Sequence, residues 1–252
     1  MIIYLILPAF NEEESLPNLL GRFSALPATQ RDHLKIFVVN DGSTDATKTV
    51  AQTAAAGLDL TILDHPQNLG LGQAVQTGIQ AAIRQGGPED VMVLMDADDT
   101  HDPRLVPLLA QAIVQGADIA IASRFVAGGD DSTAPPLRRL LSRGAALCFK
   151  TVLPLDREIH DFTSGFRAYR LSILERAVKH WGERLIEERG FACMVELLLK
   201  LRYCHPQIVE VPFQLQYNRK LSTSKIKVLR TILQYLKLAL RDRISPPPYH
   251  QL

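Results

Sequence analysis

The sequence predicts an α/β fold built on a mostly parallel sheet, and two patterns indicate it. Apolar runs of strand length alternate with stretches of helical length through the first half of the chain, which is the rhythm of parallel strands joined by right-handed crossovers. One run, residues 91–95, is apolar at every position, as expected for a strand buried on both faces. The 252 residues suffice for one large domain or for one domain with an appendage.

The elements of the first half follow in chain order. We expect strands at 1–7, 35–40, 59–64, 91–96 and 118–123. We expect helices between and after them, at 12–25, 45–56, 72–85 and 103–115. The last of these helices would begin at Pro103, a residue suited to the first helical position, with Asp102 as its N-cap.

The second half has less regular patterns. We expect helices near 137–150 and 190–201, a segment with glycine and phenylalanine around 165, and extended pieces within 207–217. Residues 128–136 are rich in Gly, Asp and Pro, which predicts a loop and a candidate mobile lid.

The C-terminal part differs from the rest in charge. Residues 219–243 contain eight basic residues and one acidic residue and carry +7, so that residues 1–218 carry −6 and the chain +1. Apolar side chains lie on one face of a predicted basic helix at about 224–243, at Ile226, Leu229, Leu233, Leu236 and Leu240. We therefore divide the chain into a domain at 1–218 and an appended helix with a proline-rich, disordered tail at 219–252. Such a helix is expected to meet an anionic surface.

Composition excludes several classes of protein. The cysteines Cys148, Cys193 and Cys204 lie far apart and form no CxxC pair, which argues against a zinc site or a disulfide framework and fits a reducing compartment. The apolar N-terminus has no basic leader and is expected to be a strand, not a signal peptide. No run approaches the ~20 apolar residues of a membrane span. We therefore expect a cytoplasmic protein, and we expect no nucleic-acid partner.

Two carboxylates, Asp96 and Asp98, directly follow the buried run. The carboxyl edge of a parallel sheet is where open α/β folds bind ligands. Carboxylates so close together repel each other unless a cation lies between them, and oxygen ligands suit Mg²⁺ or Mn²⁺ carrying a substrate phosphate. The alternative is that Asp99, Thr100 or Asp102 merely caps a helix. Since capping does not require Asp96 and Asp98, we favour the metal site.

Seven motifs support a more specific interpretation. In chain order they are P-A-F-N-E-E, V-V-N-D-G-S-T-D, N-L-G-L-G-Q-A, D-A-D-D-T-H-D-P, A-S-R-F, D-F-T-S-G-F-R-A-Y-R and N-R-K-L-S-T-S-K. Their order resembles that of family 2 glycosyltransferases of the GT-A fold, and the resemblance covers roughly residues 2–227. Within that family the chain is similar to the dolichol- or polyprenol-phosphate mannose synthases. The sequence Gln-x-x-Arg-Trp of the processive polysaccharide synthases is not found around Trp181.

The resemblance implies roles for individual residues. The residues that would bind the donor nucleotide are Pro8, Phe10, Asn11, Glu12, Asp41, Gly70, Asp96 and Ala97. Among them, Glu12 would contact the ribose and Asp41 the base. The metal, Mg²⁺ or Mn²⁺, would be held by Asp96, Asp98 and Thr100. Thr100 stands where the mannose-synthase branch has a Gln, which is a stronger ligand. The catalytic residues would be Asp96, Asp98 and Arg124. The acceptor phosphate would be bound by Arg139, Ser142, Arg219, Ser224 and Lys225.

The resemblance also implies the reaction. We expect inverting, metal-dependent transfer of a hexose, mannose before glucose, from a nucleotide-sugar to a polyprenyl or dolichyl phosphate. An acceptor phosphate is already anionic and needs positioning instead of a general base. The partners would be an anionic membrane surface and either an anchoring subunit or further copies of the chain, and the protein would be peripheral on the cytoplasmic face.

Several alternatives stay open at this point. The acceptor could instead be a hydroxyl group of a soluble or cell-envelope glycan, with Asp161 as the base, or the chain could be a non-catalytic nucleotide-binding adaptor at a membrane. Gly70 and Gly72 could serve only a tight turn. Arg167 could pair with Asp161 instead of touching substrate. The helix at 224–243 could pack on protein instead of on a membrane.

Overall fold

The protein is built on one sheet that contains every strand of the described residues. The computed structural model describes residues 1–136, 139–140, 142–144, 146, 159–221 and 228–244. Within them the strand order is β3-β2-β1-β4-β6-β5-β7. The strands are β1 (Ile3–Ala9), β2 (Leu34–Asn40), β3 (Asp59–Asp64), β4 (Val91–Leu94), β5 (Ile119–Ser123), β6 (Arg167–Arg170) and β7 (Ile208–Pro212).

The sheet is parallel except at β6. β1 pairs in parallel with β2 and with β4, and β2 pairs in parallel with β3. β6 lies between β4 and β5 and is antiparallel to both, whereas β7 is parallel to β5. The predicted mostly parallel α/β sheet is therefore confirmed, with one reversed strand.

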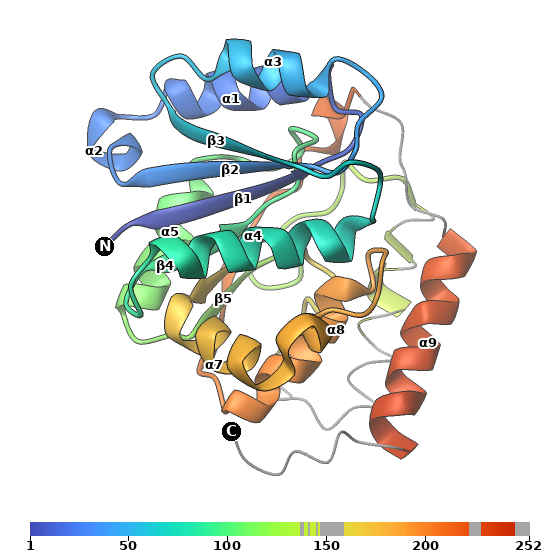
Figure 1. The fold of residues 1–252 in the computed structure, drawn as a ribbon. Coiled ribbons are helices and arrows are strands. Elements are labelled where there is room, and N and C mark those ends of the chain that lie inside the picture. Colours follow the sequence, from blue (N-terminus) through green and yellow to red (C-terminus); the bar gives the residue numbers. More distant parts are fainter. Residues whose placement is uncertain (137–138, 141, 145, 147–158, 222–227, 245–252) are drawn as a thin grey trace.

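Helices cover both faces of the sheet (Figure 1). One face carries α1 (Leu16–Ser24), α3 (Thr47–Ala54) and α5 (Leu105–Val114). The other carries α4 (Leu71–Gln85), α7 (Leu171–Trp181) and α8 (Cys193–Leu201). The short α2 (Ala28–Arg31) joins α1 to β2, and α9 (Val228–Ile244) lies near the C-terminal end of the described chain.

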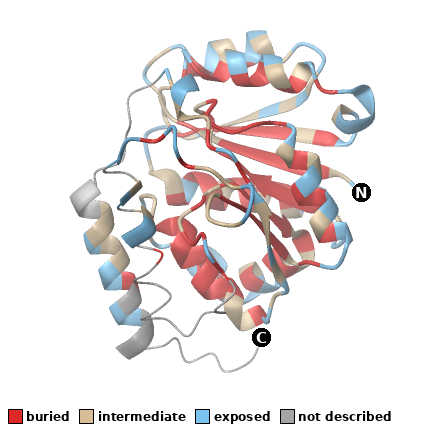
Figure 2. Ribbon diagram, turned by 180° about the vertical axis from the view of Figure 1, so that it is seen from behind, coloured by how far each residue is buried: buried red, intermediate tan, exposed pale blue. Residues whose placement is uncertain are grey.

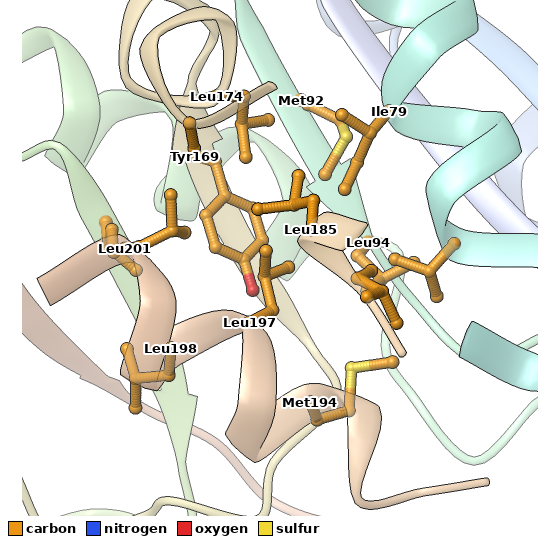
Figure 3. Packing of buried hydrophobic residues seen from close by; sticks show 14 of the residues in the cluster. Ile79, Met92, Leu94, Tyr169, Leu174, Leu185, Met194, Leu197, Leu198 and Leu201 are labelled. Carbon is orange, nitrogen blue, oxygen red and sulfur yellow. The ribbon is translucent and has the colours of Figure 1, made fainter. Parts of the chain in front are cut away.

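β1 and β4 are almost entirely apolar, because alternate side chains of each strand enter two different cores. In β4, Met92 and Leu94 face the α4 side, while Val91 and Val93 face the α1 side. Figure 2 shows the buried residues concentrated on these strands and on the helix faces against them. On the α4 side, Figure 3 shows the ring of Tyr169 among leucines of the covering helices. Burial on both faces leaves the strand ends as the places for polar side chains.

The five strands predicted for the first half are confirmed, with ends shifted by up to two residues. The four predicted helices correspond to α1, α3, α4 and α5. The predicted start of the last of these helices is wrong by two residues: α5 begins at Leu105 with Arg104 as its N-cap and without a side-chain cap. Asp102 instead accepts a hydrogen bond from the backbone N–H of Arg104 at 3.0 Å, in the turn ahead of α5. α2, β6 and α7 were not expected. The helix predicted at 137–150 lies largely outside the described residues, as do the prolines 246–248.

The predicted lid at 128–136 is tied to the segment after β7. Asp130 forms an isolated parallel bridge with Gln214, and Thr133 Oγ1 donates to the carbonyl of Leu215 at 2.5 Å. Asp131 is buried and forms an ion pair with Arg143, whose Nη2 lies 3.0 Å from Asp131 Oδ1. The loop and the segment after β7 therefore form one layer beside the sheet edge.

The basic helix α9 packs on the domain through one of its faces. Arg241 pairs with the buried Glu196 of α8 at 3.0 Å, and Gln234 donates to Glu188 at 2.9 Å. Leu238 is 1% exposed. The opposite face leaves apolar side chains exposed, at Leu233, Leu236 and Leu240. The sequence left open whether this helix packs on protein or on a membrane. Packing on protein accounts for one face of the helix and leaves the other face without a partner among the described residues.

Candidate active site

The sheet brings the sequence motifs to one edge. β1, β2 and β4 are parallel, so the segments that follow them leave the sheet at the same edge. β6 is antiparallel, with Arg167 opposite Leu94, so the segment before β6 meets the segment after β4. β7 ends with Pro212 opposite Ser123, which brings residues 213–221 to this edge as well. Residues far apart in the sequence therefore form one site.

The loops after β1 and β2 are joined by hydrogen bonds. Asn11, at φ 52°, accepts a bond from Thr44 N at 2.9 Å, and its own N–H donates to Ser43 Oγ at 3.0 Å. Glu12 N donates to Thr47 Oγ1 at 2.8 Å. Asparagine tolerates the left-handed conformation better than most residues. The pair of loops is thus fixed before any ligand arrives.

Asp41 organises the loop after β3. Its Oδ1 lies 2.7 Å from His65 Nδ1 and accepts the N–H of Leu69 at 2.9 Å, while its Oδ2 accepts the N–H of Gly70 at 2.9 Å. The role of Asp41 on a nucleotide base stays a prediction, because these contacts engage both carboxylate oxygens within the chain.

The glycines of these loops are required by the backbone. Gly42 has φ +65°, and a Cβ there would lie 2.2 Å from the carbonyl carbon of Gln67. Gly70 has φ +97°, and a Cβ there would lie 2.6 Å from the carbonyl oxygen of Arg189. Both positions exclude larger residues by conformation and by space. The tight-turn interpretation of Gly70 is therefore supported, and binding by it is a prediction.

Asp98 is nearly buried and fully engaged. Thr100 Oγ1 donates to its Oδ1 at 2.6 Å, and the ammonium group of Lys220 contacts its Oδ2. The side chains of Asp98 and Lys220 are 13% and 11% exposed. Burial alone would raise the pKa of Asp98, but the charge of Lys220 and the hydrogen bonds from Lys220 and Thr100 hold this pKa below its ordinary value. Asp98 is therefore an anion at neutral pH, as a metal ligand must be.

The backbone after Asp98 is held in an unusual conformation by Arg22 of α1. Asp99 has φ 60°. Arg22 Nη1 donates to Asp99 Oδ1 at 2.7 Å and to the carbonyl of His101 at 3.1 Å, and Arg22 Nη2 lies 3.3 Å from Asp102 Oδ1. Asp, like Asn, adopts the left-handed conformation more readily than most residues, and the contacts of Arg22 hold it there. Arg22 thus fixes the loop that presents the carboxylates.

His101 lies behind this loop, within an aromatic cluster. Its ring stacks on Phe166 with centroids 4.9 Å apart and meets the edge of Phe213 at 5.1 Å. Burial lowers the pKa of His101 below its ordinary value, so the ring is neutral at neutral pH. The cluster connects the segment before β6 and the segment after β7 to residues 96–102, the loop with the proposed metal ligands Asp96 and Asp98, which we call the metal loop.

Arg124 and Asp161 form a buried bidentate ion pair. Arg124 Nε donates to Asp161 Oδ2 at 2.8 Å and Arg124 Nη2 to Oδ1 at 2.7 Å. Asp161 is fully buried; burial would raise its pKa, but Arg124 keeps the pKa below the ordinary value. Such a carboxylate is a poor proton acceptor, which counts against Asp161 as a general base. Arg167 instead donates to the carbonyls of Met194 at 2.8 Å and Phe162 at 2.6 Å.

The predicted acceptor residues are described in part. Arg139 Nε lies 3.3 Å from Asp131 Oδ1, and Asp131 also acts electrostatically on Arg124, which places Arg139 on the Arg124 side of the site. Ser142 is half-buried and Arg219 is exposed, at the end of a short 3-10 helix, Tyr217–Arg219. Ser224 and Lys225 lie outside the described residues.

Three contributors to the site were not found by sequence reasoning. Arg22, in the predicted helix at 12–25, and Asp131, in the predicted lid at 128–136, were given no role. Lys220 was not given one either, although it adjoins Arg219. The sequence did contain a signal for Lys220. It is a cation within the motif N-R-K-L-S-T-S-K, and the neighbouring carboxylates Asp96 and Asp98 need positive charge close by. Its partner, however, lies 122 residues away in the sequence.

The comparisons with known proteins agree with this geometry. The sequence profile described as glycosyl transferase family 2 matches residues 4–177. The chain belongs to this family. Dolichol-phosphate mannosyltransferase of Pyrococcus furiosus is 36% identical over 94% of this chain, which spans 62% of that relative's length. Undecaprenyl-phosphate mannosyltransferase of Micrococcus luteus is 36% identical over 90% of this chain and 88% of its own.

Solved structures show that this family 2 glycosyltransferase has the GT-A fold. Glucosyl-3-phosphoglycerate synthase from Mycobacterium tuberculosis, in complex with Mn²⁺, UDP and phosphoglyceric acid, aligns with a TM-score of 0.69 at 19% identity, over 98% of this chain and 79% of that one. The same enzyme in complex with Mg²⁺ and UDP aligns with a TM-score of 0.67 at 19% identity, over 98% and 80%.

The residues of this glycosyltransferase fit a divalent metal that is shared with a donor. Among the described residues, no group of three or more His, Cys, Asp or Glu side chains is placed to hold a metal ion. The loop nevertheless offers Asp96, the ionised Asp98 and the hydroxyl group of Thr100. Mg²⁺ is commonly bound through one or two carboxylates, with water and substrate phosphates completing its shell. Asp96, Asp98 and Thr100 form a set of oxygen ligands of this kind.

Proposed function

We propose that this family 2 glycosyltransferase transfers a hexose, mannose in preference to glucose, from a nucleotide-sugar to a polyprenyl phosphate, with inversion at the anomeric carbon. The proposal is supported by the commitment of Asp161 to Arg124, which leaves an anionic acceptor as the better substrate because it needs no base. The relatives named for mannosyl transfer to polyprenyl phosphates support the same acceptor.

Donor binding falls to the loops after β1, β2, β3 and β4. Asp96, Asp98 and Thr100 would hold Mg²⁺ or Mn²⁺, which when bound supplies stabilisation of the negative charge on the leaving diphosphate. Arg124 adds a fixed positive charge on the same edge of the sheet, held in orientation by Asp161. A preorganised cation of this kind favours the charge that develops on the leaving group.

Acceptor binding requires positioning of a phosphate. Arg139 and Arg219 supply guanidinium groups, which suit bidentate contact with phosphate oxygens. Ser142, Ser224 and Lys225 belong to the same proposed set. Asp131 holds Arg139 in the layer formed by the lid and the segment after β7, so an arriving phosphate would exchange one anion for another at Arg139. Positioning of this kind supplies a large part of the rate enhancement when no proton transfer is needed.

The membrane contact is assigned to the exposed face of α9. Within the part of the chain that the structure describes, no helix has the length and apolarity to cross a bilayer. Leu233, Leu236 and Leu240 are 67%, 44% and 54% exposed, and Lys237 is exposed beside them. Apolar side chains flanked by cations suit the boundary between headgroups and acyl chains. We propose a peripheral position on the cytoplasmic face, with an anchoring subunit or further copies of the chain as additional partners.

A donor and acceptor screen tests the proposal. Radiolabelled GDP-mannose, UDP-glucose and UDP-N-acetylglucosamine are each incubated with Mg²⁺ or Mn²⁺, with and without a polyprenyl phosphate. We expect label from GDP-mannose in the organic phase only when both the lipid phosphate and the metal are present. Label transferred instead to a soluble glycan, with none in the organic phase, would contradict the proposal and favour a hydroxyl acceptor.

A further inference from the structure

The metal loop already carries a cation, and this cation comes from the chain itself. Lys220 contacts Asp98 Oδ2, and Thr100 Oγ1 donates to Asp98 Oδ1 at 2.6 Å. Both oxygens of this carboxylate therefore accept hydrogens. Each carboxylate oxygen can still offer a lone pair to a metal, but a divalent ion and an ammonium group on the same carboxylate repel each other. Lys220 and a metal ion consequently compete for Asp98.

The position of Lys220 is set by its backbone. Gln216 N donates to the carbonyl of Thr100 at 3.0 Å, which joins this segment directly to the metal loop. Tyr217 N donates to Thr133 Oγ1 at 3.1 Å, and Lys220 N donates to the carbonyl of Tyr217 at 3.2 Å. The segment is thus anchored on both the metal loop and the lid. An ammonium group that leaves Asp98 stays tethered beside the site.

We propose that Lys220 is a displaceable counter-ion: it neutralises Asp98 while the metal is absent, and it moves to the donor's diphosphate when the metal binds. The inference rests on the metal-ligand role proposed for Asp98. The charges require the exchange, because a divalent ion on Asp98 repels an ammonium group at contact distance. The diphosphate brings new negative charge next to the metal, and the flexible four-carbon stem of lysine lets the ammonium group reach it.

The exchange couples the two ligands. Metal alone must displace Lys220 and gives it no new partner, so metal alone binds weakly. Nucleoside diphosphate provides that partner, so each ligand increases the affinity for the other by the same factor. Removing the charge of Lys220 should therefore strengthen metal binding in the absence of nucleotide and reduce the coupling between the two ligands.

Mn²⁺ titrations followed by electron paramagnetic resonance of the free ion test this inference directly. The full chain is titrated without nucleotide and with saturating GDP or UDP, as the wild type and as Lys220→Gln, Lys220→Arg and Lys179→Gln. Lys179 is an exposed lysine of α7 and gives the matched change of charge away from the site. We expect Lys220→Gln to bind Mn²⁺ at least fivefold more tightly without nucleotide and to gain less affinity when nucleotide is added. Lys179→Gln and Lys220→Arg should stay within twofold of the wild type.

The outcomes separate the inference from the proposal on which it rests. Wild-type protein that binds no Mn²⁺ even with nucleotide would overturn the metal site itself. Wild-type binding that is unchanged in Lys220→Gln would overturn only the counter-ion role. Equal tightening in Lys220→Gln and Lys220→Arg would also overturn it, because the effect would then come from the space occupied by the side chain and not from its charge.

Discussion

Replacement of Asp161 by Asn removes the charge of a buried ion pair while keeping the shape of the side chain. Asp161 accepts hydrogen bonds from Arg124 N, Nε and Nη2 at 3.1, 2.8 and 2.7 Å, and from Ser164 N at 3.0 Å. Breaking a buried pair by removing one partner costs about 3–5 kcal/mol, since the other charge is left without compensation. Asn keeps one acceptor oxygen, so we expect a loss of about 3 kcal/mol, or about 6–12 °C in Tm.

The pH dependence gives this prediction its sign. Because the pKa of Asp161 is lower in the folded protein than in the unfolded chain, its ionised form stabilises the fold above the unfolded pKa, near pH 4. That stabilisation is lost as the pH falls through the folded pKa. The difference in Tm between wild type and Asp161→Asn should therefore be constant from pH 8 to pH 5 and should shrink below about pH 4.

Differential scanning calorimetry on both proteins, over pH 3 to 8, measures this difference. Asp32→Asn, a change at an exposed carboxylate after α2, is the matched control and should lie within about 0.5 kcal/mol of wild type. A Tm of Asp161→Asn equal to that of the control would refute the reasoning. So would a difference that is as large at pH 3 as at pH 7.

Three further predictions concern the site and the membrane. Asp98→Ala should lower metal-dependent turnover at least about a hundredfold in a protein that still folds, with a lower Tm because Lys220 loses its partner, and transfer that persists in a chelator would exclude the metal role. Arg139→Ala should raise the acceptor's KM about tenfold and the donor's KM little, as steady-state kinetics would measure; equal changes would remove Arg139 from the acceptor site. Replacing Leu233, Leu236 and Leu240 with Ser should weaken binding to anionic vesicles in a sedimentation assay, and unchanged sedimentation would mean that this face covers protein.

Local patterns were enough to predict the parallel part of the sheet and the position of the loop that carries Asp96 and Asp98. Residues 91–95 are apolar throughout, so the strand and the position of Asp96 and Asp98 at its end follow from the sequence alone. The loops after β1 and β2 were predicted for the same reason, because a buried strand that ends in polar residues marks the edge of the sheet.

The reversed strand and the charge pairs could not be predicted in this way. β6 has only four residues, R-A-Y-R, and two of them are arginines that suggest an exposed segment. Arg167 is nevertheless fully buried, because the carbonyls of Met194 and Phe162 accept its hydrogen bonds. Likewise, Arg124 finds Asp161 and Asp98 finds Lys220 only after the sheet has brought distant segments together. Such partners depend on topology, which residue spacing does not encode.

The product of the reaction tests the central claim most directly. Wild-type protein is incubated with GDP-mannose, a polyprenyl phosphate and Mg²⁺ or Mn²⁺, and the lipid fraction is examined by mass spectrometry and proton NMR. The account predicts the polyprenyl phosphate with one added hexose, joined through the phosphate oxygen and with the anomeric configuration inverted relative to the donor. A hexose with retained configuration, or one found on a hydroxyl group and never on the phosphate, would contradict it.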